Sequence, residues 1–289
     1  MNGISFLIVC YKSEMELGSL VESILYYLDV PKDYIEIIVI DNYGKGRERE
    51  IVNRLRVDYD IDISYVLSST NTGYGVGNNL AISYAKYKYA CVVNPDVRFV
   101  KPFISSVVTN FEDNSNVLAI SGKQLSKLSQ SYFVRPEYQF PIIKAIFNKL
   151  INRVPFVHKY MALSGALTFY DIEKFKEIGL FTDDIFLYCE ESDVALRALK
   201  KGYEIVYDKD LLYLHLDWHR ERVELLSVEI LLESVITYSK LNGVSVLSYL
   251  LSGVVHSYIK LLKSYLFRYK VDVEYYRKLN SLYRRYLRG

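Results

Sequence analysis

Short apolar runs alternate with polar segments along the first 120 residues of the chain. The runs are rich in β-branched residues, carry almost no charge and cover residues 4–10, 35–40, 65–67 and 89–93. Runs of this length and composition predict buried strands. The segments between them have helical potential and cover residues 17–28, 47–57 and 71–87. Strands that alternate with helices predict an α/β fold with a mostly parallel sheet and right-handed crossovers.

The alternation stops after a further predicted strand at residues 117–122. Residues 125–160 mix prolines and aromatic rings with aliphatic and basic side chains, and the basic ones are Lys144, Lys149, Arg153, His158 and Lys159. This composition fits a helix lying over a site or against a membrane surface, and it equally fits a plain surface insertion.

The pattern becomes regular again near residue 171. It predicts a short helix at 171–180, a helix from about Ser192 to Gly202, short strands at 203–207 and 211–215, and long helices from Glu221 onward. We therefore expect one α/β domain over residues 1–220, with halves of about 1–122 and 123–220, and a helical region over 221–289.

Composition places the chain among ordinary globular proteins. It has 289 residues, about half of them apolar, and a net charge of +2, so nucleic acid is not an expected partner. Cys10, Cys91 and Cys189 lie far apart without metal-type spacing, which favours buried free thiols in a reducing cytoplasm. The N-terminus lacks the basic region and cleavage site of a signal peptide and is expected to form the first strand of a cytoplasmic protein.

One predicted strand ends in a carboxylate. The run at 89–93 stops at Asn94, Pro95 and Asp96, and the carboxyl ends of strands are where open α/β sheets bind ligands. A carboxylate there can hold a divalent cation against a diphosphate. The alternative is a simple turn, because the same three residue types are common in turns.

Three closely spaced glycines follow the third predicted strand. Gly73, Gly75 and Gly77 suggest a dinucleotide-binding turn at first. Their spacing is G-x-G-x-G, however, and a Rossmann fingerprint normally occupies the first strand-to-helix turn. A nicotinamide or flavin site is therefore disfavoured. A turn capped by Asn and a backbone that passes close to a bound nucleotide sugar both remain open.

Glu190 and Glu191 come just before the helix predicted from Ser192. A helix N-terminus favours ionised carboxylates, so two acids there indicate either capping or chemistry. Asp193 and Arg197 are four residues apart and are expected to form a structural ion pair.

Taken together, these blocks resemble family-2 glycosyltransferases, which have the GT-A fold, and in particular their rhamnosyltransferase-like subgroup. The resemblance runs from about residue 4 to 215 and rests on four pieces in the family's order. The pieces are Val9 to Lys12 with Asp41 and Asn42, Asn71 to Gly75 with Asn79, Asn94 to Val97, and Gly165 and Ala166 with Phe186 to Asp193.

The resemblance implies a nucleotide-diphospho-sugar donor and a divalent cation, Mg²⁺ or Mn²⁺. Asp41 matches the acid that holds the nucleotide base, Asp96 matches the metal-binding acid of the D-x-D motif, and His215 matches a histidine that reaches the metal or diphosphate. Asn94 replaces the first acid of that motif, and a satisfied core histidine is the alternative for His215. The residues that the resemblance places at the donor are Cys10, Tyr11, Asp41, Asn71, Gly73, Asn79, Asn94 and Asp96.

The resemblance also implies a general base for the acceptor hydroxyl. Glu191 falls on the family's second acid and Glu190 on the first; Glu191 is longer than the usual Asp, and Cys189 stands where Gly or an aromatic residue is more common, so Glu190 or Asp193 are alternatives for the base. Gly165, Ala166 and Asp193 belong to the acceptor region. The implied reaction is an inverting transfer, with rhamnose from dTDP-rhamnose as the best expectation, to a saccharide in bacterial surface-polysaccharide assembly. A non-catalytic sugar-nucleotide-binding or scaffold protein is the alternative.

The last thirty residues are basic and rich in tyrosine. Lysines and arginines interleave with Leu, Phe and Tyr there, and only Asp272 and Glu274 are acidic. Such a segment suits the anionic inner face of a membrane, which would agree with a lipid-linked acceptor. A solvated helical tail, packed on the domain or on a second subunit in a homodimer, is the alternative.

Overall fold

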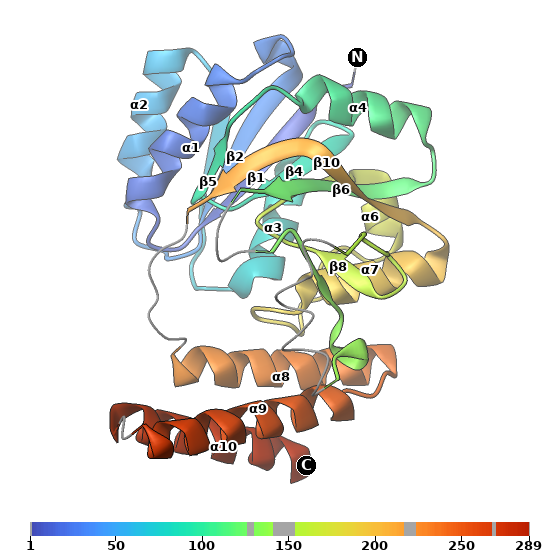
Figure 1. Cartoon of the computed structure of the whole chain (residues 1–289). Helices are drawn as coiled ribbons and strands as arrows, with labels where there is room; N and C mark the ends of the chain where they lie inside the picture. The colour runs from blue at the N-terminus through green and yellow to red at the C-terminus, as the bar shows by residue number, and fades with distance from the viewer. Residues whose placement is uncertain (1, 126–129, 141–153, 217–223, 268–269, 289) are drawn as a thin grey trace.

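The computed structural model describes residues 2–125, 130–140, 154–216, 224–267 and 270–288 (Figure 1). An α/β part with a central sheet lies above a layer of three helices. Within the expected helix or insertion at 125–160, residues 126–129 and 141–153 fall outside the described residues, together with Lys144, Lys149 and Arg153. His158 and Lys159 are described.

An eight-stranded sheet forms the centre of the α/β part. Its strand order is β3-β2-β1-β4-β9-β6-β10-β5. The bounds are β1 Ile4–Cys10, β2 Ile35–Asp41, β3 Ile63–Leu67, β4 Tyr89–Val93, β5 Val97–Phe99, β6 Val117–Gln124, β9 Leu167–Asp171 and β10 Glu204–His215. A separate two-stranded sheet pairs β7 Tyr132–Val134 with β8 Met161–Leu163.

The first four strands are parallel, as the alternation of strands and helices predicted. Cys10 at the end of β1 pairs with Asp41 at the end of β2, so these carboxyl ends lie at one edge of the sheet. β9 then runs antiparallel between β4 and β6. The mostly parallel sheet and its helical C-terminal region agree with the expected GT-A fold.

The two short strands predicted at 203–207 and 211–215 are in fact one strand. β10 runs parallel to β6 with an irregularity between Asp208 and Leu212, and its end then pairs antiparallel with β5. The polar residues between the two apolar runs mark this irregularity and not a turn. The last pair, His215 with Val97, brings His215 to the turn that follows β4.

Helices cover both faces of the sheet, and each face has its own apolar core. One core includes side chains of α1 Glu14–Tyr26, α2 Arg49–Tyr59 and α4 Ile104–Asp113. The other includes side chains of α3 Gly73–Tyr84, α6 Ile172–Glu177 and α7 Glu190–Lys201. The helix α7 begins at Glu190, two residues before the predicted start at Ser192. The three cysteines are buried free thiols, as expected.

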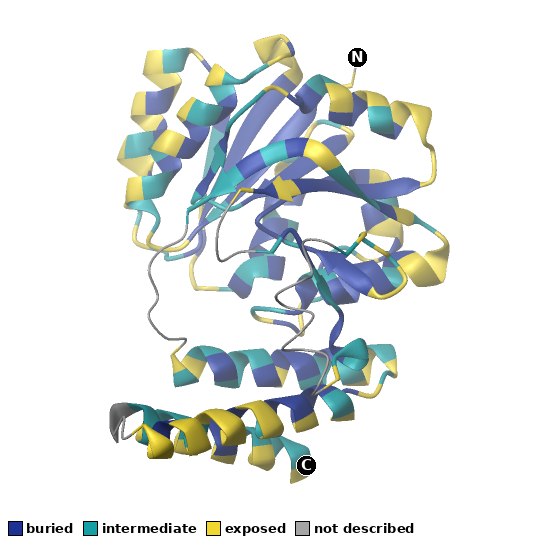
Figure 2. Cartoon of the chain, viewed as in Figure 1, coloured by how far each residue is buried: buried dark blue, intermediate teal, exposed yellow. Residues whose placement is uncertain are grey.

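Three C-terminal helices, α8 Leu225–Asn242, α9 Leu247–Leu266 and α10 Lys270–Arg288, form the lower layer (Figures 1 and 2). They share a core with Ile185, Cys189 and Leu196, which flank or belong to the start of α7. The helix α8 also fixes this region through hydrogen bonds, because Ser234 donates to the carbonyl of Leu187 at 2.7 Å. Among the helices within the described residues, none has the length and apolar character needed to cross a bilayer.

Candidate active site

Asp41 organises a loop at the carboxyl end of β2. Its buried carboxylate accepts hydrogen bonds from the backbone N–H groups of Tyr43, Gly44 and Gly46, at 3.1, 2.9 and 2.7 Å. The Tyr65 hydroxyl donates a fourth bond at 2.8 Å. Gly44 has a φ of 71°, and a Cβ there would lie 2.9 Å from the carbonyl oxygen of Ser68. The acid expected to hold a nucleotide base therefore also shapes the loop beside that position.

A second buried carboxylate, Glu48, lies near Asp41 and was missed by the sequence analysis. Its Oε1 accepts a bond from the N–H of Ser13, and its Oε2 has no hydrogen-bond partner within the described residues. Burial raises the pKa of Glu48, and the charge of Asp41 adds to that rise. The residues around Glu48 are mostly charged, as is typical of a solvated helix start. The sequence therefore gives no sign that Glu48 is buried.

Of the two neighbouring residues expected at the donor, Tyr11 is exposed and Cys10 is buried. The ring of Tyr11 is exposed and contacts the ring of Tyr43 edge-on, with centroids 5.3 Å apart. The Lys12 ammonium lies over both rings. The Cys10 side chain is fully buried, and burial raises the pKa of its thiol. Tyr11 therefore faces solvent at this edge, whereas Cys10 contributes only its backbone carbonyl, which accepts a bond from Asn42.

The glycine-rich segment serves close packing inside the chain. Asn42, the residue after β2, binds this segment. Its side-chain amide donates to Asn71 Oδ1 at 3.1 Å and to the Gly73 carbonyl at 3.0 Å. Gly73 has a φ of 85°, and a Cβ there would lie 2.2 Å from the Phe186 carbonyl oxygen. The residues that the sequence placed at the donor thus hold the segment 181–187 that leads to α7.

Asn79 makes a two-point contact with that same segment. Its amide nitrogen donates to the Phe181 carbonyl at 2.8 Å, and its Oδ1 accepts from the Phe181 N–H at 3.1 Å. A side chain that satisfies both backbone groups of one residue fixes the path of the loop. Asn79 was expected at the donor, and the structure places its side chain in a loop contact.

Asp96 and His215 meet at the carboxyl end of β4. Oδ1 of Asp96 lies 3.2 Å from Nε2 of His215, although the two residues are far apart in sequence. Their side chains are 26% and 21% exposed, so both remain open to a ligand. The N–H of Leu216 also donates to the Asp96 carbonyl at 3.0 Å. His215 therefore lies at the end of β10 beside this polar turn, with its side chain partly exposed.

Gln124 orients His215 and was missed by the sequence analysis. Its Nε2 lies 3.1 Å from Nδ1 of His215, which directs Nε2 of the ring toward Asp96. Its Oε1 accepts bonds from the Tyr213 and Ser164 hydroxyls, at 3.1 and 3.3 Å. An amide nitrogen can only donate, so Nδ1 accepts this bond and the ring proton of the neutral imidazole lies on Nε2, facing Asp96. Binding of a cation by Nε2 requires the other orientation of the Gln124 amide, in which Oε1 accepts from Nδ1–H.

The donor atoms of Asp96 and His215 fit a divalent cation. Mn²⁺ accepts carboxylate and imidazole ligands together, and Mg²⁺ is usually held by one or two carboxylates plus phosphates and water. Within the described residues, no group of three or more His, Cys, Asp or Glu side chains could hold a metal ion. A cation at this pair would therefore complete its coordination with diphosphate oxygens and water.

Glu191 lies in the first turn of α7, and its side chain is bound by Gly165, which precedes β9. The N–H of Gly165 donates to Oε1 of Glu191 at 3.1 Å. A Cβ on Gly165 would lie 2.3 Å from that same oxygen, so only glycine allows this contact. Burial raises the pKa of the Glu191 carboxyl, although the Gly165 N–H partly opposes the rise. A carboxylate with a raised pKa is a stronger base than an ordinary surface glutamate.

The two neighbouring acids have different surroundings. Glu190 is buried, and its Oε1 has no hydrogen-bond partner within the described residues. Burial raises its pKa well above the usual range, with a further contribution from Glu191. Asp193 accepts bonds from Arg197 at 2.6 and 2.8 Å, as expected, and from Asn242 of α8 at 2.8 Å. Asp193 therefore ties α7 to α8.

The backbone just before these acids is strained. Tyr188 and Cys189 have φ values of 73° and 70°, in the left-handed region that favours glycine. This conformation explains why glycine would suit position 189. Backbone strain of this kind costs about 1–3 kcal/mol per residue and persists only where the surroundings impose it, often at functional sites.

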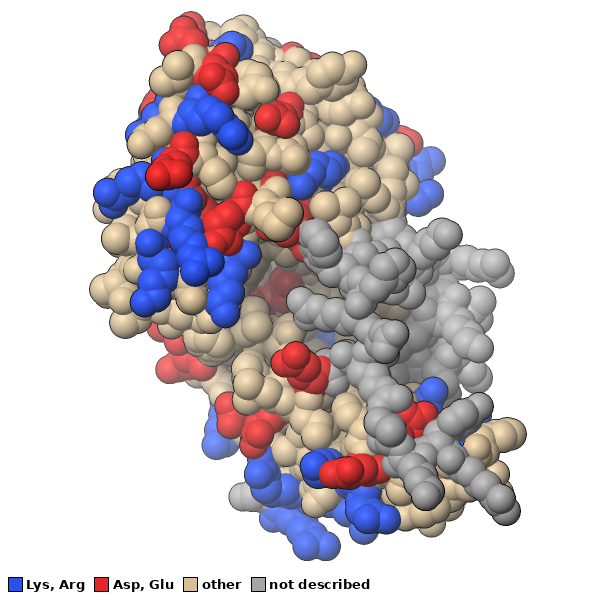
Figure 3. Space-filling view, turned by 90° about the vertical axis from the view of Figure 1, so that its left-hand side faces the viewer, with Lys and Arg blue, Asp and Glu red and all other residues tan. Residues whose placement is uncertain are grey.

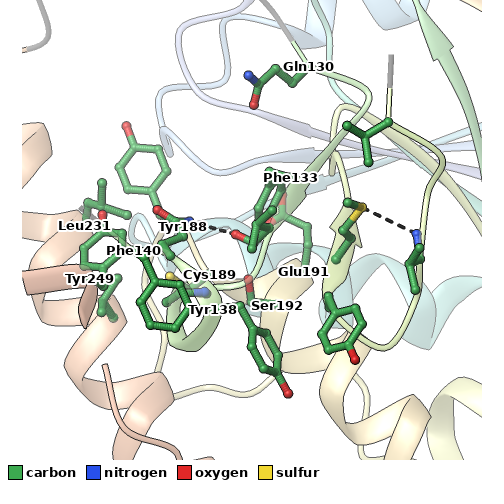
Figure 4. Close-up of a pocket in the computed structure, with 18 residues that line it drawn as sticks. Gln130, Phe133, Tyr138, Phe140, Tyr188, Cys189, Glu191, Ser192, Leu231 and Tyr249 are labelled. Atoms are coloured by element: carbon green, nitrogen blue, oxygen red, sulfur yellow. Dashed lines mark hydrogen bonds between the residues drawn. The ribbon is translucent and has the colours of Figure 1, made fainter. Parts of the chain in front are cut away.

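A pocket of about 640 Å³ lies beside Glu191 (Figure 4). Its walls come from the η2 turn Pro136–Tyr138, the β7–β8 sheet, the start of α7, and α8 and α9. Its labelled apolar side chains are Phe133, Tyr138, Phe140, Leu231 and Tyr249. Aromatic and aliphatic walls with one carboxylate are typical of a small-molecule site.

The short segment of Ser164, Gly165 and Ala166 connects the two acidic centres. Ser164 bonds Gln124, which contacts His215, and Gly165 bonds Glu191. The Ala166 carbonyl accepts from the Asn94 N–H at 2.9 Å. Figure 3 shows the molecule hollowed between the sheet-bearing part and the helices below, with acidic side chains around the hollow. Hydrogen bonds thus connect the Asp96–His215 pair to Glu191, although neither Asp96 nor His215 lines the pocket beside Glu191.

The mostly parallel central sheet with its helical C-terminal region is a GT-A fold. The family described as Glycosyl transferase family 2 matches residues 5–179. Because that match covers more than half of the chain, the protein belongs to this family. The rhamnosyltransferase-like subgroup is not distinguished by it.

Two characterised relatives are similar to this chain. One is the low-salt glycan biosynthesis hexosyltransferase Agl10 of Haloferax volcanii, 26% identical over 215 residues that cover 71% of this chain and 64% of the relative. The other is the poly-beta-1,6-N-acetyl-D-glucosamine synthase of Staphylococcus epidermidis, 22% identical over 208 residues that cover 72% of this chain and 48% of the relative. The chain thus spans less than two thirds of each relative's length.

Among solved structures, the fold is similar to that of the mannosyltransferase PcManGT from Pyrobaculum calidifontis, a complex with GDP-Man and Mn²⁺. The TM-score is 0.60 with 13% sequence identity, and the match covers 99% of this chain and 85% of the other. At this identity the likeness establishes the fold, and it extends over the C-terminal helices.

Proposed function

We propose that the protein is an inverting, divalent-cation-dependent glycosyltransferase that moves a sugar from a nucleoside diphosphate to a hydroxyl of a saccharide acceptor. The observation that carries this proposal is the segment of Ser164, Gly165 and Ala166. It contacts the Glu191 carboxylate directly, the Asp96 turn through Asn94, and His215 through Gln124. A transfer reaction needs these two centres at a fixed separation, because the hydroxyl that the base deprotonates must reach the anomeric carbon of the donor.

Each centre has a separate task. Asp96 and His215 would hold the cation, which supplies positive charge against the departing diphosphate. Glu191 takes the proton of the acceptor hydroxyl as its oxygen bonds to the anomeric carbon. The bond from that carbon to the diphosphate breaks at the same time, and the electron pair leaves with the diphosphate. A single displacement inverts the anomeric centre and needs only one base.

On the donor side, we place the nucleotide along the edge formed by Tyr11, Asp41 and the Asp96 turn. The exposed ring of Tyr11, the Lys12 ammonium and the acid-centred loop around Asp41 support this placement. Rhamnose from dTDP-rhamnose remains our proposal for the donor. It is based on the resemblance of residues 94–97 to the rhamnosyltransferase-like subgroup. The matched hexosyltransferase and poly-beta-1,6-N-acetyl-D-glucosamine synthase make a hexose and N-acetylglucosamine the other candidates for the donor sugar.

On the acceptor side, the pocket beside Glu191 receives the saccharide. Its aromatic walls suit the apolar faces of a sugar ring or an apolar group attached to it, which supports a lipid-linked acceptor in surface-polysaccharide assembly. The alternative of a non-catalytic scaffold is less well supported, because Glu191, Asp96 and His215 are all present and are connected by hydrogen bonds through Gln124 and residues 164–165.

A nucleotide-sugar panel tests the proposal. Thermal stability would be measured with dTDP-, UDP- and GDP-sugars, each with Mn²⁺, with Mg²⁺ and with a chelator, because a ligand of the native state raises Tm. One donor should raise Tm only when a cation is present, and the same donor should support transfer to an added glycan. Binding without any turnover would favour the scaffold, and the absence of any cation-dependent shift would refute the donor assignment.

A further inference from the structure

The helix α9 carries an exposed apolar stripe. Its large apolar side chains that are exposed to solvent recur every three or four residues, so they share one face of the helix. They are Leu247, Leu251, Val255, Tyr258, Ile259, Leu262, Tyr265 and Leu266, with exposures from 39% to 79%.

The buried face of the same helix is made largely of small and polar residues. Gly253 packs against the ring of Tyr283, and Asn280 donates to the Val254 carbonyl and to the Ser257 hydroxyl, at 2.9 and 2.8 Å. A surface helix usually has its large aliphatic residues inside and its polar residues outside. Exposed apolar patches of this extent mark a contact surface for another molecule.

The charges beside this stripe indicate whether a second copy of the chain or a lipid surface covers it. Lys260 and Lys263 are exposed along α9, and the helix contains no acidic residue. On the neighbouring α10, Arg277 reaches the Tyr265 hydroxyl at 2.5 Å. A second copy that met the stripe with its own α9 would bring no acid to pair with these lysines, whereas a surface of anionic lipids supplies negative charge along its whole length.

We propose that the α9 stripe, defined by the eight residues above, docks the protein on an anionic membrane surface. The helix lies in the interface with its apolar face in the acyl boundary and its lysines at the phosphates. Figure 3 shows further Lys and Arg side chains at this lower end of the molecule. Tyr249 of the same helix lines the pocket beside Glu191, so docking brings that pocket close to the membrane.

This inference centres the expected membrane contact on the exposed face of α9, which overlaps the basic last thirty residues at positions 260–266, and it does not depend on the proposed reaction. Vesicle binding can be measured without a donor or an acceptor. A failure of lipid binding would therefore leave the glycosyltransferase proposal intact, and a failure of transfer would leave the docking surface intact.

Vesicle co-sedimentation of the full chain provides the test. Wild type should bind vesicles of phosphatidylcholine and phosphatidylglycerol in equal parts, and bind pure phosphatidylcholine at least about fivefold more weakly. The triple variant Val255→Ser, Ile259→Ser, Leu262→Ser should lose about tenfold or more in binding to the mixed vesicles, because it removes apolar area from the interface. The double variant Lys260→Gln, Lys263→Gln should lose binding and its salt dependence together.

A matched triple variant controls for general effects. Met15→Ser, Tyr26→Ser, Val57→Ser removes three apolar side chains that are at least as exposed, on α1 and α2, and it should bind vesicles like wild type. All variants should keep the wild-type far-ultraviolet spectrum, since the changed side chains are exposed. Wild-type binding by the α9 triple variant would overturn the proposal. So would a wild-type dimer that this variant dissociates, with no vesicle binding by either protein.

Discussion

The donor-side and acceptor-side acids are positioned by different means. Asp96 follows directly from a strand end, and its place at the sheet edge is set by the parallel register of neighbouring strands. Glu191 depends on contacts that are distant in sequence: the Gly165 N–H, the loop held by Asn79, and the α8 helix that anchors Leu187. The parallel strands thus set the position of Asp96, whereas the position of Glu191 depends on Gly165, Asn79 and α8.

The largest effect should come from removing the base. Glu191→Gln keeps the shape of the side chain but cannot take a proton, so kcat should fall about 10²- to 10⁴-fold, the usual contribution of general base catalysis. The control is Glu173→Gln, an exposed acid on α6 that should retain wild-type activity. Wild-type turnover by Glu191→Gln would move the base elsewhere and remove the distinction between the two sides.

The pH dependence of the wild-type enzyme adds to this comparison. Because burial raises the pKa of Glu191, the base should become protonated at a higher pH than an ordinary glutamate, whose pKa is about 4.3. The transfer rate should therefore fall on the acid side while the pH is still above that value.

A smaller effect should follow from disturbing the connection between the two sides. In Gly165→Ala the new methyl group would meet Oε1 of Glu191, so the carboxylate must shift. A displacement of about 1 Å can cost about 10²-fold in rate, and donor affinity should remain near that of wild type. Gly18→Ala is the control, because a Cβ there has no heavy atom closer than 3.7 Å. Equal losses of donor affinity and rate would show that Gly165 does not act through Glu191.

The smallest effect concerns stability. The folded-state pKa of Glu190 is raised, so its contribution to stability is fully present below the unfolded-state pKa and is lost as the pH rises through the folded-state value. Glu190→Gln should therefore be more stable than wild type at neutral pH, with Tm higher by about 2–4 °C if the gain is roughly 1 kcal/mol.

Thermal melts across pH check this expectation. The difference in Tm between Glu190→Gln and wild type should shrink as the pH falls toward about 4.3. Glu173→Gln, whose side chain is exposed, should show no such trend. A variant less stable than wild type at neutral pH would mean that Glu190 is held as a charged group, contrary to its buried and unpartnered oxygen.

The sequence was sufficient for the donor half because local patterns decide it. The apolar runs that end at Asp41 and Asn94 predicted both the parallel strands and the place of their polar residues, and the structure agrees. Glu48 was missed because nothing in its charged neighbourhood marks its burial. The assignment of Asn79 to the donor came from motif position alone, which does not reveal that its amide binds Phe181.

The part of the site built by residues 123–220 was less predictable because its geometry comes from distant contacts. Gln124 acts on His215 through a pairing of strands that are far apart in sequence, and the irregularity in β10 hid the continuity of that strand. The left-handed conformations of Tyr188 and Cys189 run against the preferences of both residues. Local reasoning fails at such positions because the surrounding structure imposes the conformation.

Paired donor titrations test the central claim most directly. Calorimetry with the identified nucleotide sugar and Mn²⁺ would be performed on Asp96→Ala and Glu191→Gln, together with single-turnover transfer by each variant. We predict that Asp96→Ala loses cation-dependent donor binding, whereas Glu191→Gln binds donor with wild-type affinity and fails to transfer it. Wild-type donor affinity in Asp96→Ala, or a comparable loss of affinity in both variants, would contradict the division into a donor edge and a separate base.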